Sequence, residues 1–340
     1  MLRGKLPVAL AVPKTISLAL ATIAVASACQ IIGGYQSFQS GDGAVPPPPH
    51  PCDALGTQPK YDEKGGATLV LVKETTGKCY WIAKTEVTVG QYSRFLAAHN
   101  SQAIPWDPDR CAWKDAGSDP VAETSDPCSL TINDPAVQES MPFDNEKPIR
   151  CVDWCDAKAF CNWAGKQGNG PSDNTAFSMD LCDGIGVPEN WDPFGLPDRW
   201  GEACSENAGA AYPYGPPPAV LGNCNVGLGD AGRCLSVVGQ LACAPTTVGN
   251  FTKCRGPSGT VDMIGNVAEW VIQCGFLLDS GAPAPDSLCQ VRGGSFAETL
   301  EGEDCYHTSI LAQKRHTRDR RIGFRCCADL TVAERRLTGQ

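Results

Sequence analysis

The sequence predicts an α+β protein with little regular secondary structure and several disulfides. Three observations support this fold class. Glycine and proline, 36 and 27 of the 340 residues, interrupt most of the chain and leave little room for long helices or strands. Only two segments have helical periodicity, and only two short runs are typical of strands. The 19 cysteines are too many for a reducing compartment, where disulfides are rare.

The first 28 residues are typical of a secretory signal peptide. Three basic residues precede a 13-residue run of apolar and small residues, Ile16 to Ala28, which is too short to span a bilayer comfortably. Small residues directly before Cys29 are also similar to the site at which bacterial lipoproteins are cut and acylated. The alternative is ordinary cleavage at the same bond. We therefore expect an exported protein, either lipid-anchored in the cell envelope through Cys29 or secreted.

Three further parts follow the signal peptide. Residues 29–51 are rich in glycine, serine, glutamine and proline, with four consecutive prolines at 46–49, which favours an extended tether. Cysteines then recur without a long charged or low-complexity gap, so we expect one folded domain over residues 52–327. Residues 328–340 are polar, and this tail is expected to fray.

The first regular elements of the domain are predicted to be two strands and a helix. Apolar and β-branched residues over Thr68–Val72 and Cys79–Ile82 are typical of short strands. Thr88 and Gln91 then form the pattern of a capping box, and apolar residues follow at helical spacing. A helix is therefore expected to about Ala98.

A second helix is predicted to begin at Asp153. Ala157, Phe160 and Cys161 recur at helical spacing and form one apolar face. Gly165 is the expected C-terminal stop. Glycine, proline and asparagine dominate most of the remaining sequence, so no other helix is predicted.

The charge of the chain limits its partners. With 28 basic and 38 acidic residues the net charge is −10, which argues against nucleic acid and leaves a lipid on Cys29 as the expected membrane contact. Residues 314–321 are a local exception, with five lysine or arginine residues in eight positions. This segment either attracts an anionic ligand or forms a solvated face that pairs with an acidic surface.

The cysteines are expected to form disulfides rather than metal sites. If Cys29 carries lipid, 18 cysteines remain, an even number that can all pair. There is no C-x2-C pair, and the four histidines do not offer a helical metal-binding pair, which argues against zinc and non-haem iron. Neighbouring strand residues point to opposite faces, so we expect different partners for Cys326 and Cys327.

Six segments, taken in order, resemble the formylglycine-generating enzyme and sulfatase-modifying-factor family. They are Lys84-Thr85-Glu86-Val87-Thr88 with Gln91-Tyr92 and Phe95-Leu96; Val152-Asp153-Trp154 with Asp156-Ala157, Phe160-Cys161 and Trp163-Ala164-Gly165-Lys166; Tyr212-Pro213-Tyr214-Gly215; Asp262-Met263-Ile264-Gly265-Asn266-Val267-Ala268-Glu269-Trp270; Arg292-Gly293-Gly294-Ser295-Phe296; and Gly323-Phe324-Arg325. Each motif alone is weak, but their order and spacing are specific. The resemblance implies an irregular, loop-rich variant of the C-type-lectin fold, commonly held by calcium.

The resemblance also implies where calcium would bind. The implied ligands are the side chains of Asp262 and Glu269 and the carbonyl groups of Gly265 and Val267, with Asn225 and Val226 as part of a second site. Two carboxylates and the carbonyls between them suit a cation that takes six to eight oxygen ligands. The alternative is a tight turn in which both carboxylates are solvated or cap nearby amides.

The sequence departs from the family at the catalytic copper site. In catalytic members, two cysteines bind copper, which activates oxygen to convert a sulfatase cysteine into formylglycine, and soft thiolates suit Cu(I). Here the first position, three residues after Ser295, is Glu298, and the second lies near Cys305. The family's active-site tryptophan is Ala268. These departures argue against copper, and Cys305 is better explained as half of a structural disulfide.

Two functions remain open. The first is an exported binding or structural module that presents a loop-built pocket to a protein, a peptide or a glycan. The second is an oxygen-dependent oxidase acting on a side chain of an exported protein, with Ser295 and Cys305 in the pocket and Glu298 as a ligand or base. We favour the binding module because the copper cysteine pair is missing, although the fold alone does not fix function.

Overall fold

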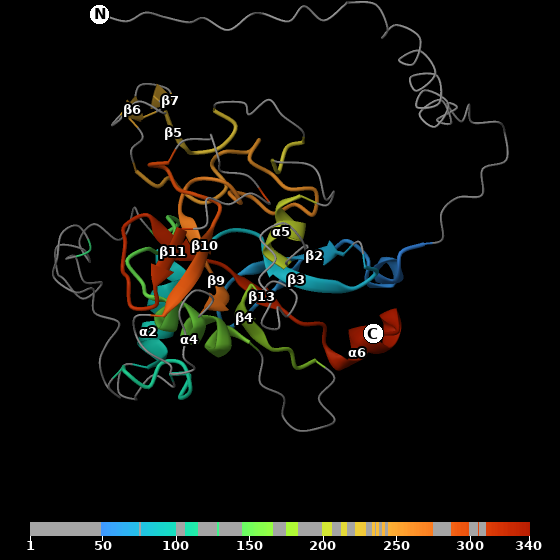
Figure 1. Ribbon diagram of the computed structural model, residues 1–340. Coiled ribbons are helices and arrows are strands. Elements are labelled where there is room, and N and C mark those ends of the chain that lie inside the picture. The colour runs from blue at the N-terminus through green and yellow to red at the C-terminus, as the bar shows by residue number, and fades with distance from the viewer. Residues whose placement is uncertain are drawn as a thin grey trace, which may run out of the picture. The chain divides into compact units, whose positions relative to one another are not determined.

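The structure, a computed structural model, describes residues 49–74, 76–99, 106–114, 128, 145–165, 175–182, 199–205, 212–215, 222–228, 233–234, 236–237, 240–241, 244–274, 287–298, 305 and 311–340. The chain divides into two units, residues 1–49 and 50–340. Apart from Pro49, the first unit lies outside the described residues, as do the predicted signal peptide, Cys29 and most of the tether. Figure 1 shows the elements of the second unit, an irregular α+β fold.

The larger sheet has five antiparallel strands in the order β1-β2-β3-β13-β4. These are β1 (Lys60–Tyr61), β2 (Thr68–Lys73), β3 (Cys79–Ala83), β13 (Cys326–Ala328) and β4 (Met179–Leu181). The two strands predicted from sequence are confirmed as β2 and β3, each with one further residue. The last strand of the chain, β13, inserts between β3 and β4, so the sheet joins distant parts of the sequence.

The second sheet has four strands in the order β11-β10-β9-β12. These are β11 (Leu311–Lys314), β10 (Leu288–Arg292), β9 (Ala268–Cys274) and β12 (Ile322–Phe324). β12 runs parallel to β9, and the other pairs are antiparallel. Two small hairpins complete the described strands: β5 (Gly227–Leu228) with β6 (Arg233–Cys234), and β7 (Ser236–Val237) with β8 (Gln240–Leu241).

The helices are short, and four of the five described ones begin at a side-chain cap. They are the 3-10 helix η1 (Pro51–Leu55), α2 (Val89–Ala98), α4 (Trp154–Ala164), α5 (Arg199–Cys204) and α6 (Val332–Thr338). Both predicted helices are confirmed as α2 and α4, with Thr88 and Asp153 as their N-caps in complete capping boxes. Gly165 caps α4 as predicted. A Cβ there would lie 2.9 Å from the backbone nitrogen of Met179, so no side chain fits between α4 and β4.

The polar tail does not fray as expected, because residues 332–338 form the helix α6. Thr331 caps this helix. The carboxylate of Glu334 in turn accepts from the backbone nitrogen of Thr331 and pairs with Lys60. Leu330 is buried directly before it. The side chain of Gln340 also bonds with the backbone of the β2–β3 turn. The polar residues therefore find partners on the folded unit instead of solvent.

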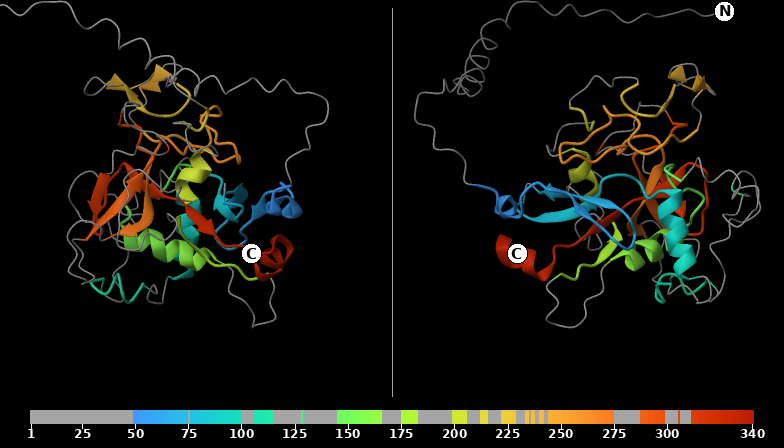
Figure 2. Two further views of the ribbon diagram at one scale, coloured as in Figure 1. Left: turned by 45° about the vertical axis from the view of Figure 1, so that its right-hand side comes forward. Right: turned by 180° about the vertical axis from the view of Figure 1, so that it is seen from behind.

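The core lies where α2 and α4 meet the two sheets. Figure 2 shows α4 beside β4 and β9 in both views, with α2 next to α4, in agreement with the contacts of these elements. Trp154 and Trp270 are fully buried. The indole of Trp154 donates to the carbonyl of Val271, and that of Trp270 donates to Val152, each at 2.9 Å. These reciprocal bonds join the start of α4 to β9.

Eight disulfides connect described residues. They are Cys52–Cys79, Cys111–Cys155, Cys128–Cys151, Cys161–Cys326, Cys182–Cys327, Cys204–Cys305, Cys224–Cys254 and Cys274–Cys289. Cys326 and Cys327 have different partners, as strand geometry predicts. Full pairing of 18 cysteines remains a prediction for the others. Within the described ranges, no helix has the length and hydrophobicity needed to span a membrane.

Candidate functional site

The Gly293-Gly294-Ser295 turn places the first predicted pocket residues. Both glycines have left-handed backbone, with φ of 86° and 63°, and a Cβ on Gly293 would lie 2.6 Å from the carbonyl oxygen of Met263. The turn buries Ser295 completely. The Ser295 hydroxyl donates to the carboxylate of Glu298 and accepts from the backbone of Ala297.

Glu298 is held from two sides. One carboxylate oxygen accepts from Ser295, and the other accepts from Arg321 Nη1 at 2.9 Å. Arg321 also donates to both oxygens of Asp319, at 3.0 and 2.7 Å. Burial raises the pKa of Asp319, but the hydrogen bonds from Arg321 outweigh it and hold this pKa below its ordinary value. A carboxylate fixed between a hydroxyl and a guanidinium is poorly suited to act as a free base.

Cys305 is half of a structural bridge, as predicted. It is fully buried and bonded to Cys204 at the end of α5. Its backbone carbonyl accepts from Arg292 Nη2 at 2.9 Å, and the Arg292 guanidinium lies over the ring of Trp200. The structure therefore brings Ser295 and Glu298 into contact, while the sulfur of Cys305 is committed to another element.

The predicted calcium segment surrounds a buried arginine. Glu269, in β9, accepts from Arg325 Nε at 2.8 and 2.7 Å and from Arg325 Nη2 at 2.6 Å. The indole nitrogen of Trp200 donates to the same carboxylate at 2.7 Å. All three side chains are buried. Glu269 is therefore held in a charged cluster rather than solvated.

Two more carboxylates extend this cluster. Asp262, with a left-handed φ of 55°, accepts from the backbone nitrogen of Gly249 at 2.5 Å, and burial raises its pKa to about 6. Glu86 accepts from Asn266 Nδ2 at 2.9 Å with one oxygen, while its other oxygen is buried without a partner. Burial and the charge of Asp262 raise the pKa of Glu86 well above its ordinary value.

These contacts test whether the segment fits calcium. Three N–H groups, two of Arg325 and one of Trp200, already donate to the two oxygens of Glu269, with the Nε–H of Arg325 shared between both oxygens, so the guanidinium charge lies directly against this carboxylate. Glu269 therefore does not fit as a calcium ligand in this arrangement. No three acidic, histidine or cysteine side chains within the described ranges are grouped as a metal site.

The predicted second calcium site lies in the same network. Asn225 is buried, and its Nδ2 donates to the carbonyl of Ala244 at 3.2 Å and to Asn266 Oδ1 at 3.1 Å. Its backbone carbonyl accepts from Asn266 N at 2.7 Å. Val226 follows as a buried residue. Calcium at Asn225 and Val226 remains a prediction.

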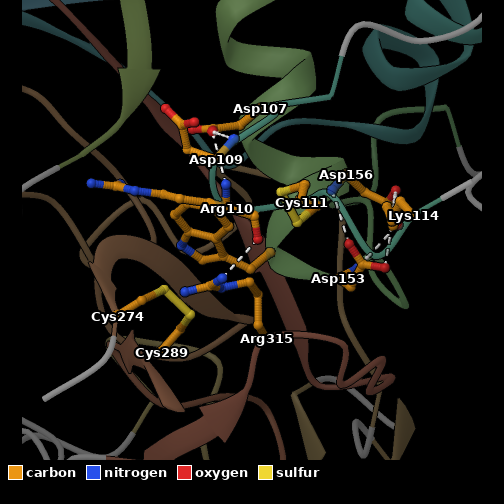
Figure 3. The surroundings of a disulfide bond; sticks show 12 residues. Asp107, Asp109, Arg110, Cys111, Lys114, Asp153, Asp156, Cys274, Cys289 and Arg315 are labelled. Atoms are coloured by element: carbon orange, nitrogen blue, oxygen red, sulfur yellow. Dashed lines mark hydrogen bonds and ion pairs between the residues drawn. A yellow bond between two sulfur atoms is a disulfide. The ribbon is translucent and has the colours of Figure 1, made fainter. Parts of the chain in front are cut away.

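Most of the basic segment 314–321 is engaged within the protein. Arg318 Nη2 lies 3.2 Å from Asp153 and 3.0 Å from Asp156, and Lys114 pairs with the same two carboxylates. Arg315 donates to the backbone carbonyl of Arg110 at 2.7 Å. Figure 3 shows Lys114 beside both aspartates and the bond from Arg315 to Arg110. The carboxylate partners of Arg318 are thus buried, not on the acidic surface that the sequence suggested.

Asp156 is the most perturbed member of this second cluster. It is fully buried at the start of α4. Burial and the charge of Asp153 raise its pKa to about 6, against the opposing attraction of Lys114 and Arg318. Neither this cluster nor the roles of Glu86 and Arg325 were predicted from the sequence. A usable signal was Arg325 itself, because a charged residue inside the apolar run from Ile322 to Ala328 needs a buried partner.

Comparison with known proteins gives both a family and structural neighbours. The family model described as "Sulfatase-modifying factor enzyme 1-like domain" matches residues 55–330. PvdO from Pseudomonas aeruginosa is 18% identical, with a TM-score of 0.47 over 81% of this chain and 98% of its own. CarF is 16% identical, with a TM-score of 0.42 over 76% and 92%. Treponema denticola variable protein 1 is 15% identical, with a TM-score of 0.44 over 81% and 99%. No curated protein sequence shows a significant match.

Proposed function

Because the chain belongs to the family of sulfatase-modifying factor enzyme 1-like domains, we propose that it is an exported binding module without copper-dependent oxidase activity. Its ligand is expected to be a protein, a peptide or a glycan of the same compartment. The net charge of −10 argues against nucleic acid.

The observation that carries this proposal is the disulfide between Cys204 and Cys305. Copper chemistry of the family type needs two thiolates that can reach one Cu(I) ion. The sulfur nearest to the second cysteine position, Cys305, is fully buried and already bonded. At the first position Glu298 supplies a hard carboxylate, and both of its oxygens are engaged by Ser295 and Arg321. Neither position offers a soft ligand.

The disulfides support a role outside the cell interior. The eight bridges are typical of an oxidising environment and support export of the protein. We further propose that a lipid on Cys29 anchors the folded unit through the tether of residues 29–51. The intact mass of the protein from its natural membrane fraction tests this point, because an unmodified Cys29 would exclude the anchor.

A direct assay tests the absence of oxidase activity. The oxidised mature chain is incubated with Cu(I), oxygen and a peptide containing Cys-x-Pro-x-Arg, and the peptide is analysed by mass spectrometry for the aldehyde. We expect no aldehyde, and no more oxygen consumption than peptide and copper give without the protein. A catalytic family member, treated in parallel, shows that the assay works.

A matched variant tests whether copper chemistry is absent because the Cys305 thiol is blocked in a disulfide or because the copper site itself is missing. Cys204→Ser releases the thiol of Cys305 without altering Glu298, Ser295 or Arg321. We expect this variant to form no aldehyde either, because one cysteine and one carboxylate make a poor Cu(I) site. Aldehyde formation by the wild-type chain would overturn the proposal in favour of the oxidase.

A further inference from the structure

The guanidinium of Arg325 is surrounded by oxygen atoms from several parts of the chain. Its nitrogens contact both carboxylate oxygens of Glu269 at 2.6 to 2.8 Å. They also donate to four backbone carbonyls at 3.0 to 3.4 Å, those of Ala83, Lys84, Val261 and Asp262. A positive charge among six oxygens has the coordination that calcium finds in proteins.

We infer that Arg325 is a built-in cation that takes the place of calcium at the Asp262–Glu269 segment, so that this segment closes without metal. The guanidinium carries its charge at every pH at which a protein folds. It is completely buried, and it belongs to the short connection between β12 and β13. The cation is therefore supplied by the chain itself whenever the two sheets assemble.

The surroundings of Glu269 leave no place for a second cation. Arg325 and Trp200 direct three N–H groups at its two oxygens, and a calcium ion at Glu269 would lie next to the guanidinium charge and be repelled by it. Asp262 is engaged separately: its carboxylate accepts from Gly249 and its carbonyl accepts from Arg325. The two side chains that family resemblance assigns to one ion thus have different partners.

Direct backbone bonds close the rest of the segment. The Gly265 nitrogen donates to the carbonyl of Gly293 at 2.8 Å, and the Asn266 nitrogen donates to the carbonyl of Asn225 at 2.7 Å. A Cβ on Gly265 would lie 2.4 Å from the Asn225 carbonyl oxygen, so the two backbones touch. The Asp262–Glu269 segment is therefore joined directly to Gly293 and Asn225 by backbone hydrogen bonds.

The test compares the oxidised wild-type chain with Asp262→Asn. This variant removes one implied ligand but keeps an oxygen that can accept from Gly249 and leaves the Glu269–Arg325 pair intact. Thermal melting is measured in excess EDTA and in about 1 mM CaCl2, and calcium binding is measured by calorimetry. For a site with a dissociation constant of about 10 μM, this calcium concentration exceeds the dissociation constant about 100-fold. Binding would then raise the melting temperature by several degrees.

We expect either no calcium effect in both proteins, or an effect of the same size in both, which would place any ion elsewhere. Calcium binding and stabilisation in the wild type that disappear in Asp262→Asn would overturn the inference. As a second arm, Arg325→Lys keeps the charge but loses the planar set of donors. In this variant, hydrogen exchange of residues 262–269 is expected to accelerate equally with and without calcium. If calcium restored the protection of residues 262–269 from exchange in this variant, the inference would also be contradicted. Neither arm of the experiment depends on the absence of oxidase activity.

Discussion

Asp153 and Asp156 show how single residues in this protein carry charge into the core. Both carboxylates cap the start of α4, and both contact Lys114 and Arg318. Two negative and two positive charges balance when all four groups are ionised. Removing one partner of such a buried group leaves an uncompensated charge, which is strongly destabilising. The four side chains therefore depend on one another.

The pKa of Asp156 leads to a prediction about pH. Asp156 releases its proton at about pH 6 in the folded state, against 3.8 in the unfolded chain. Its contribution to stability is therefore complete below the lower value and is lost as the pH rises through the higher one. Two pKa units correspond to about 3 kcal/mol. Between pH 4 and 7, the free energy of unfolding of the wild type should fall by about this amount relative to Asp156→Asn, measured by urea denaturation of the oxidised proteins.

The control for this experiment is Asp109→Asn. Asp109 is exposed and lies outside the cluster of Asp153, Asp156, Lys114 and Arg318. Its substitution should leave the pH profile parallel to that of the wild type. Parallel profiles for the wild type and Asp156→Asn would contradict the assignment of the raised pKa to Asp156.

Individual residues were predictable from sequence where the cause is local. The divergent partners of Cys326 and Cys327 follow from the alternation of side chains along a strand. The contact of Arg325 with Glu269 and the contact of Glu86 with Asn266 were not predictable in the same way. These residues lie far apart in the sequence and meet only because β9, β12 and β3 assemble in one unit.

At the scale of elements, the predicted helices were right because their start signals are local. Thr88 with Gln91 and Asp153 with Asp156 satisfy each other's backbone groups within four residues. The prediction that the polar tail frays was wrong, because a polar composition does not exclude a capped helix. Thr331 and Glu334 form the same kind of capping box, and Glu334 also finds Lys60 on β1. The local signal was present, but the tertiary partner was not visible in the sequence.

The capping box of α6 can be tested by Thr331→Ala. The Thr331 hydroxyl accepts from the backbone nitrogen of Glu334 at 3.2 Å, and its loss should destabilise the helix by about 1 kcal/mol. Hydrogen exchange of residues 332–338 is expected to accelerate, while the exchange of α2 and α4 stays unchanged. Leu337→Ala is the control, because Leu337 is 65% exposed and its loss should change stability by less than about 0.5 kcal/mol. Unchanged exchange in Thr331→Ala would show that tertiary contacts alone hold α6.

At the scale of the whole unit, two disulfides act together on β13, an interior strand of the larger sheet. Cys161–Cys326 and Cys182–Cys327 nominally close loops of 165 and 145 residues. Their ends at β13 are adjacent, and their other ends, Cys161 and Cys182, are only 21 positions apart. While one bridge is intact, the other therefore restrains a loop of about 20 residues rather than the full span. The spacing of the cysteines along the sequence does not reveal that both bridges end on β13.

Removal of one of these bridges should accordingly cost less than its span suggests. We expect Cys161→Ala with Cys326→Ala to lower the free energy of unfolding by about 3 kcal/mol, whereas an isolated loop of that span would give about 5 kcal/mol. Loss of Cys274–Cys289, which spans 15 residues, should cost about the same 3 kcal/mol and is the matched control. Urea denaturation under non-reducing conditions measures both. A clearly larger loss for the first pair would show that the two bridges restrain the unfolded chain independently.

The position of Gln340 has one more consequence. Its side chain lies against the Cys52–Cys79 bridge, with Nε2 4.0 Å from the sulfur of Cys52 and 3.0 Å from that of Cys79. The polypeptide thus enters and leaves the folded unit at the same place, as Figure 2 shows for η1 and α6. A unit of this kind can be grafted into a surface loop of a host protein, or have its ends spliced and be reopened elsewhere, with little rearrangement of its interior.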